Sequence, residues 1–176
     1  MSIRPFRSPH HTSSSVALVS GGSLPQPGEI SPAHQGVLFL DELPEFHRDC
    51  LEALRHPLED GFIRVSRINK SFVFPASFML VCAMNPCPCG YFTDPKKTCR
   101  CNPNKIKNYM GKISGPLLDR IDIYIEVPTA RYQDLTNNLP AESSVQIKER
   151  VNKARAIQRE RFNDEGILSN ALMGHK

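Results

Sequence analysis

The amino-acid sequence predicts an α/β protein built on a parallel sheet with flanking helices. Two continuous apolar runs, residues 36–40 and 78–83, have the length of strands, and each is followed by polar residues. A segment of helical period follows the first run, and alternation of strands with helices is typical of parallel sheets. Continuous runs are also typical of strands buried on both faces, so we expect both faces of the sheet to be covered.

The composition is that of one ordinary globular domain with a small appendage. The chain has 176 residues, of which 40% are hydrophobic and 23% are charged. No apolar stretch reaches the roughly 18 to 20 residues that a membrane helix needs, and residues 1–11 lack the apolar core of a secretory signal. We therefore expect a cytoplasmic protein with no membrane partner. The net charge of +4 permits contact with nucleic acid but does not indicate it.

The first third of the chain predicts loops followed by a strand and a helix. The first 35 residues are rich in Ser, Pro and Gly, which predicts loops with at most one short element near Val16 to Val19. The first strand follows and ends at an acidic pair. Residues 44–58 then carry apolar side chains at helical spacing, with Gly61 just past the end.

The rest of the chain predicts a hairpin, two further strands and two helices. Alternation over residues 63–74 indicates a β-hairpin with a basic tip, ahead of the second buried strand. Asn102 begins a helix, and residues 121–127 predict a third strand. A capping box of Ser143 and Gln146 predicts a strongly charged helix to about Phe162, with Ile147, Val151, Ala154 and Ile157 toward its inner face. Its basic residues are expected to form a solvated face, with a nucleic-acid stripe as the alternative.

Polar side chains follow the first two predicted strands where each ends. Asp41 and Glu42 come after one strand and Asn85 after the other. Because carboxyl ends of parallel strands meet at one edge, we expect these side chains to share a crevice. Asp41 suits a Mg²⁺ ligand beside nucleotide phosphates, and Glu42 suits a carboxylate that polarises the attacking water. Asn85 could hold the same water or sense a γ-phosphate. The alternatives are a buried strand that ends in acids and an asparagine that caps a turn.

Arg120, just before the third predicted strand, suits an arginine finger. A guanidinium is permanently charged and forked, so it can neutralise developing phosphoryl charge in the site of a neighbouring subunit. The alternative is a surface ion pair with Asp119 or Asp122.

Four of the six cysteines form two close pairs, Cys87 with Cys89 and Cys99 with Cys101. Four thiolates suit tetrahedral Zn²⁺, and Gly90 permits the tight turn that such a knuckle needs. Four protein ligands leave no open position, so this zinc would be structural. The spacing departs from the commoner CxxC pairs, and free thiols or an adventitious disulfide are the alternatives.

Taken in order, the segments GVLFLDELPEF, MLVCAMNPCPCG and GPLLDRIDIYIEV resemble one family closely: the magnesium-chelatase-like AAA+ ATPases, and within them the bacterial ComM/YifB branch. The opening RPFRSPHHTSSSVALVSGGSLPQPGEISPAHQGVLFLDE resembles the same branch, and RVNKARAIQRERF resembles the start of its C-terminal helical domain. The resemblance covers nearly the whole chain. It implies an AAA+ core over residues 1–128, a linker over 129–142 and the start of a helical lid domain over 143–176.

This resemblance also implies roles for residues. It makes Asp41 and Glu42 the Walker B acids, Asn85 the first sensor and Arg120 the arginine finger. The implied cofactors are ATP and Mg²⁺, with Asp41 on the metal and Glu42 and Asn85 beside it. The implied activity is Mg-ATP hydrolysis coupled to helicase-like nucleic-acid remodelling in a ring, as a homohexamer.

Two insertions would point into the pore of that ring. One lies around Ser20 to Pro32 and the other is the hairpin over 63–74. The resemblance implies that Arg64, Arg67 and Lys70 meet the threaded DNA.

The sequence departs from the family pattern because it contains no phosphate-binding loop of the form G-x-x-x-x-G-K-[ST]. The family carries this loop upstream, so we expect the chain to be the later part of a longer module and inactive alone. A motor subunit for magnesium insertion into a porphyrin is a second interpretation. The cysteine pairs and the PHH segment resemble the ComM branch and argue against it. A zinc-stabilised binding module is a third. His10 and His11, in a Ser- and Pro-rich loop, are expected to be solvated.

Overall fold

The computed structural model describes residues 3–21, 26–67, 70–128, 142–163, 167 and 170–173. The chain divides into two compact units, Met1–Thr129 and Ala130–Lys176.

The first unit is built on a three-stranded parallel sheet in the order β1-β4-β7. Its strands are β1 (Phe6–Arg7), β4 (Val37–Leu40) and β7 (Met79–Cys82). The two longer strands are those that the apolar runs predict, and the α/β class with a parallel sheet is confirmed. Strand β1 was not predicted, because a two-residue strand after a proline has no apolar run.

Close approach of β1 to β4 depends on Gly36. A Cβ atom at this position would lie 1.9 Å from the carbonyl oxygen of Pro5, so no other residue fits without moving the backbone. The Val37 N–H donates to the same carbonyl at 2.9 Å, and this bond starts the ladder between the strands.

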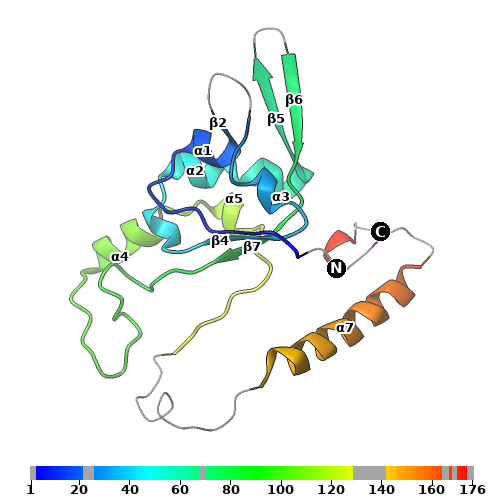
Figure 1. Cartoon of the computed structure of the whole chain (residues 1–176). Helices are drawn as coiled ribbons and strands as arrows, with labels where there is room; N and C mark the ends of the chain where they lie inside the picture. The colour runs from blue at the N-terminus through cyan, green and yellow to red at the C-terminus, as the bar shows by residue number, and fades with distance from the viewer. Residues whose placement is uncertain are drawn as a thin grey trace. The chain divides into compact units, whose positions relative to one another are not determined.

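Helices cover one face of the sheet. Figure 1 shows α1 (Ser15–Val19), α2 (Arg48–Ala53) and α3 (Arg55–Asp60) on one side of β4 and β7. The alternate residues Leu38 and Leu40 of β4 point into this core and are fully buried. They pack in a cluster with residues from the helices and loops, among them Leu18, Ile30, Leu43, Leu51, Leu54 and Leu117.

The opposite face of the sheet is open among the described residues, which corrects the prediction that both faces are covered. Met79 and Val81 of β7 are 64% and 38% exposed, and Phe6 of β1 is exposed as well. The apolar runs correctly indicate that both faces suit burial. Which face receives a layer of helices depends on segments far away in the chain.

The predicted helix over residues 44–58 is divided. A 3₁₀ turn, Leu43–Glu45, precedes α2 and α3, which meet at the buried Leu54. Pro57 lacks the N–H that would continue the helical ladder to residue 53, so the helix breaks one turn before it. As predicted, Gly61 ends the segment, in a left-handed conformation with φ of 73°.

The first unit also contains two antiparallel hairpins. The strands β5 (Phe62–Arg67) and β6 (Lys70–Pro75) form the predicted hairpin, which Figure 1 shows projecting from the helices and sheet. A smaller pair, β2 (Ser20–Gly21) and β3 (Gln26–Pro27), lies within the predicted insertion. The tips of both, residues 68–69 and 22–25, lie outside the described residues.

The third strand predicted over residues 121–127 does not form. Among the described residues no strand pairs with this segment, and Ile123, Ile125 and Val127 are 74%, 79% and 83% exposed. Alternating apolar residues show that the segment suits a sheet, but a strand also needs a neighbouring ladder of backbone donors and acceptors.

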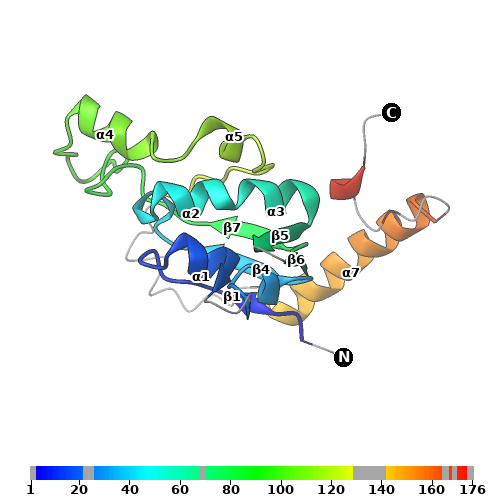
Figure 2. The same ribbon diagram turned by 90° about the horizontal axis from the view of Figure 1, so that it is seen from above.

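Two helices lie between the cysteine-rich loop and this segment, as Figure 2 shows from above. The first, α4 (Pro103–Met110), begins as predicted at Asn102, whose side chain accepts the Lys105 N–H at 2.7 Å. The second, α5 (Gly115–Leu118), buries Leu117 in the core.

The second unit contains α7 (Ser144–Arg161) and a 3₁₀ turn, Asn170–Leu172. The capping box of Ser143 and Gln146 is confirmed. The expected inner face is not buried, because Ile147, Val151 and Ile157 are all exposed. Most of the predicted linker, residues 129–141, lies outside the described residues. None of the described helices is long and apolar enough to cross a membrane.

We expect the two faces of the sheet to respond differently to truncation. Leu40→Ala removes a fully buried side chain and should lower the free energy of unfolding by about 2–5 kcal/mol. The matched control Met79→Ala, on the open face, should change it by less than about 1 kcal/mol. Urea denaturation followed by circular dichroism measures both, and equal losses would contradict the one-sided core.

Candidate functional site

The ends of two neighbouring strands bring three predicted site residues to one edge of the sheet. Asp41 and Glu42 follow β4, and Asn85 follows β7, its parallel neighbour. Backbone bonds continue the pairing beyond the strands, from the Ala83 N–H to the Leu40 carbonyl at 2.9 Å and from the Leu43 N–H to the Ala83 carbonyl at 3.0 Å. The acid pair and the amide therefore face solvent side by side, at the edge where parallel sheets bind ligands.

The acidic turn has an unusual backbone. Glu42 has φ of 54° and ψ of 45°, a left-handed conformation that costs a residue with a Cβ atom on the order of 1–3 kcal/mol. The Asp41 carboxylate accepts the Glu42 N–H at 2.9 Å, and the Glu45 N–H closes the turn onto the Glu42 carbonyl at 2.7 Å. The conformation turns the chain sharply out of β4 and leaves both carboxylates exposed.

His11 belongs to this site, although its sequence context predicts a solvated side chain. Its Nδ1 lies 3.1 Å from Oε2 of Glu42, and its side chain is 28% exposed. The His10 ring lies beside it, with 4.1 Å between the ring centroids. The signal that could have identified it is its place after a strand adjacent to β4, but that strand is too short to predict.

Residues of α4 and of the turn after it contact the edge of the sheet that carries Asp41, Glu42 and Asn85. Tyr109 is buried, and burial together with the charge of Glu45 raises the pKa of its hydroxyl, while a hydrogen bond from the Asn85 backbone lowers it. Lys112 pairs with Glu45 at 3.3 Å and lies over the Tyr109 ring. The acidic turn and the Asn85 turn thus contact one common support.

Arg120 lies elsewhere. Its guanidinium pairs with Glu59 near the end of α3 at 2.5 Å, rather than with Asp119 or Asp122, and donates to the Pro116 carbonyl at 2.8 Å. The hydrogen bond and charge of Arg120 lower the pKa of Glu59. The acid pair precedes α2, so α2 and α3 separate it in the chain from this ion pair, and the described residues do not bring Arg120 to Asp41 or Asn85.

The β5–β6 hairpin carries basic residues in the middle of its ladder and at its last pair. Arg64 is exposed, with its guanidinium 5.6 Å from the centre of the Phe62 ring, and Lys70 is exposed too. Arg67 stands opposite Lys70 in the ladder, but its side chain is outside the described residues. The buried partners Ile63 and Val65 fix which side of β5 faces solvent.

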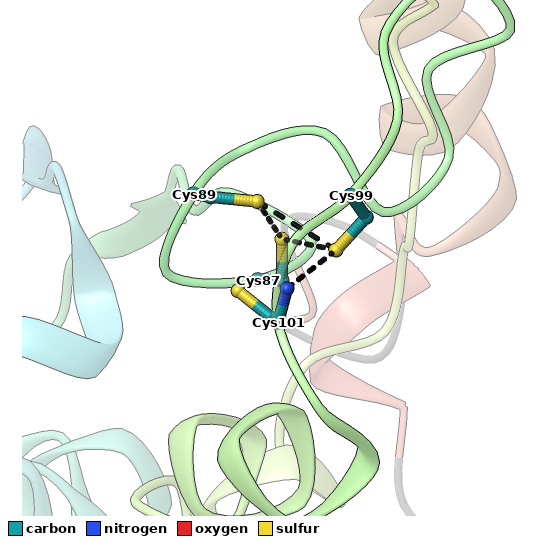
Figure 3. Close-up of side chains that lie close together, drawn as sticks. All are labelled: Cys87, Cys89, Cys99 and Cys101. Atoms are coloured by element: carbon teal, nitrogen blue, oxygen red, sulfur yellow. Dashed lines mark hydrogen bonds between the residues drawn. The ribbon is translucent and has the colours of Figure 1, made fainter.

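The four clustered cysteines converge as a metal site would require. Figure 3 shows Cys87, Cys89, Cys99 and Cys101 pointing toward one another, and their sulfur atoms all lie within 4.8 Å. Three of the separations are 3.3, 3.6 and 3.7 Å. Zn–S bonds of about 2.3 Å in a tetrahedron place sulfur atoms about 3.8 Å apart, so this donor set fits zinc.

The thiols are all free, so the adventitious disulfide is absent from this structure. The backbone N–H groups of Tyr91 and Arg100 lower the pKa of Cys89 to about 6. The Cys101 N–H lowers that of Cys99, but burial and the neighbouring thiols raise it to about 12. A bound dication would supply the charge that lets all four sulfurs be thiolates. The site would tie the loop after Asn85 to the start of α4.

Comparison with known proteins finds one matching family model and several similar sequences. The family model described as magnesium chelatase, subunit ChlI, matches residues 1–135. Competence protein ComM of Haemophilus influenzae is 54% identical over 159 residues, 90% of this chain and 31% of ComM. YifB of Escherichia coli is 50% identical over 161 residues, 91% of this chain and 31% of YifB. The magnesium-chelatase 67 kDa subunit of Chlorobaculum parvum is 36% identical over 71 residues, 40% of this chain and 12% of that subunit.

The chain thus spans about a third of the length of ComM and of YifB.

We expect near-stoichiometric zinc in reduced protein purified without added metal, because the four sulfurs already stand at tetrahedral spacing. Cys87→Ser and Cys99→Ser should each lose most of it by elemental analysis. The matched control Cys82→Ala should retain it, since Cys82 lies in β7 and burial raises its pKa to about 12. Wild-type protein without metal would contradict the assignment.

Proposed function

This chain belongs to the magnesium chelatase subunit ChlI family, and from that premise we propose that it is part of an AAA+ ATPase motor subunit of the ComM type. The observation that carries the proposal is the shared edge at which Asp41, Glu42 and Asn85 end two parallel strands. Carboxylate, carboxylate and amide in this order suit one metal ligand, one base and one neutral sensor.

In this proposal each residue of the edge has a separate task. Asp41 holds Mg²⁺, which neutralises charge on nucleotide phosphates when bound. Glu42 orients and polarises the attacking water, since an exposed carboxylate beside the metal ligand can accept its proton. Asn85 can donate its amide N–H to that water or to a phosphate oxygen without adding charge. The phosphate-binding loop comes from sequence outside these 176 residues.

Arg120 serves the neighbouring subunit in a homo-oligomeric ring, which we propose to be a hexamer. Its pairing with Glu59, away from the acidic edge, suits a role in trans. The ion pair with Glu59 and the bond to Pro116 fix the guanidinium, and its Nε atom is buried without a hydrogen-bond partner among the described residues. A fixed guanidinium can stabilise phosphoryl charge with little loss of conformational entropy.

The polymer that the motor acts on is nucleic acid, most simply the DNA of a recombining cell. Support comes from two exposed basic side chains of the projecting hairpin, Arg64 in the middle of β5 and Lys70 at the last pair of the ladder. Phosphate contacts need positive charge without sequence readout, as expected of a translocating element. Residues 143–176 form the start of the helical lid domain, and the whole acts in the cytoplasm.

Magnesium insertion into a porphyrin is the second candidate. Identity to the chelatase subunit is 36% over 40% of the chain, against 54% over 90% for ComM. The ComM type is therefore favoured. A zinc-stabilised binding module without enzymatic activity is the third candidate. It would apply only to the 176 residues in isolation.

Hydrolysis should depend on Glu42. In the full-length protein that contains this chain, Glu42→Gln should lower kcat for ATP by on the order of 10²–10⁴-fold, because it removes the base and keeps the size of the side chain. KM should change little. The nearby Asp49→Asn, at an exposed position of α2, is the control and should retain activity. The isolated 176 residues should release no phosphate, and turnover by them that Glu42→Gln abolishes would contradict the need for an upstream loop.

Contact with DNA should depend on the hairpin. Replacing Arg64, Arg67 and Lys70 by alanine should weaken binding and reduce the slope of log affinity against log salt by about one per lost phosphate contact, with basal ATPase retained. A charge-matched control replaces Lys148, Lys153 and Arg159 on α7, all exposed. Unchanged DNA affinity in the hairpin variant, or an equal loss in the α7 variant, would argue against a pore hairpin.

A further inference from the structure

The chain after β1 runs beside the chain after β4 and brings His11 to the acidic turn. Phe6 stands opposite Val37 in the parallel ladder, and His11 follows Phe6 by as many residues as Glu42 follows Val37. The parallel pairing thus brings both segments to the same end of the sheet. There Nδ1 of His11 lies 3.1 Å from Oε2 of Glu42.

The imidazole is held from two sides. The His10 ring lies against it, tilted by 34° with 4.1 Å between centroids, and the Phe46 ring meets it edge-on at 6.3 Å between centroids. The loop itself is ordered by the Ser13 N–H, which donates to the His10 carbonyl at 2.9 Å, and by the Cys50 thiol, which donates to the Ser13 carbonyl. The ring is therefore placed by surrounding packing.

Glu42, by contrast, lies at the surface. Its side chain is 52% exposed, and its backbone adopts a strained left-handed turn that points the carboxylate toward His11. An incidental surface ion pair contributes little to stability and gives no reason for this strain. Strained backbone at an exposed carboxylate is typical of functional sites, where the surrounding structure enforces it.

We propose that His11 is a positioning residue for Glu42. The proposal rests on the proposed ATPase function and adds a residue to it. The Nδ1–H of His11 donates to Oε2 of Glu42, which fixes the carboxylate and leaves Oε1 to accept a hydrogen bond from the attacking water. A neutral imidazole that carries its proton on Nδ1 is sufficient for this bond.

Steady-state kinetics of the full-length protein that contains this chain test the role. His11→Ala should lower kcat for ATP by about 10-fold to 10²-fold, because a misplaced base loses orientation, and should leave KM for ATP and nucleotide affinity unchanged. His11→Asn should recover much of kcat, since its amide N–H occupies the place of Nδ1–H. The control His47→Ala, an exposed histidine at the start of α2, should behave as wild type.

A measurement independent of turnover checks the contact itself. Nitrogen-15 NMR of the histidine rings in the 176-residue chain should show neutral His11 protonated on Nδ1 and, in Glu42→Ala, the shift toward Nε2 protonation that a free imidazole prefers.

The outcomes of these experiments distinguish failure of the positioning role of His11 from failure of the proposed ATPase function. An active wild type whose kcat is unaffected by His11→Ala, or a His11 that is protonated on Nε2 in the wild type, overturns the positioning role alone. A full-length wild type that hydrolyses no ATP overturns the proposed function, and this role with it. A fall in kcat that His11→Asn restores at constant KM supports the role.

Discussion

The parallel pairing of β4 with β7 is the constraint on which the candidate site depends. Leu40 and Cys82 form the last rung of the ladder, and Ala83 extends it by bonding to Leu40 and Leu43. Backbone bonds therefore set the spacing between the acid pair and Asn85. The same register turns Leu38 and Leu40 into the core, so a slip of one residue would expose them and misplace the site together.

Neighbouring segments then restrict the side chains at this edge. His11 reaches Glu42 from the loop after β1, and Lys112 holds Glu45 on the other side of the turn. The cysteine cluster closes the loop that leaves Asn85 and returns it to α4, where Tyr109 packs beside the Asn85 backbone. These contacts come from distant parts of the chain, so the edge is stiffened by tertiary structure, as a preorganised site requires.

Among the exposed apolar surfaces of the described chain are the open face of the sheet around Met79 and Val81 and the extended segment 121–127. Large exposed apolar surfaces favour association with another layer of apolar groups. The unpaired segment also offers backbone donors and acceptors to a further strand. The apolar runs over 36–40 and 78–83 thus predicted strands correctly but not a layer on both faces, and the strand predicted over residues 121–127 does not form.

The sequence by itself determined the α/β class, the two long strands, the hairpin over 63–74 and the caps at Asn102, Ser143 and Gly61, because each depends on neighbouring residues or on a local period. It also determined that Asp41, Glu42 and Asn85 end strands, and that four cysteines occur as two pairs. Only the tertiary structure decided that β1 joins the sheet, that residues 121–127 stay unpaired, that Arg120 bonds Glu59 and that His11 meets Glu42. These outcomes depend on which distant segments become neighbours, and a local pattern carries no information about its partner.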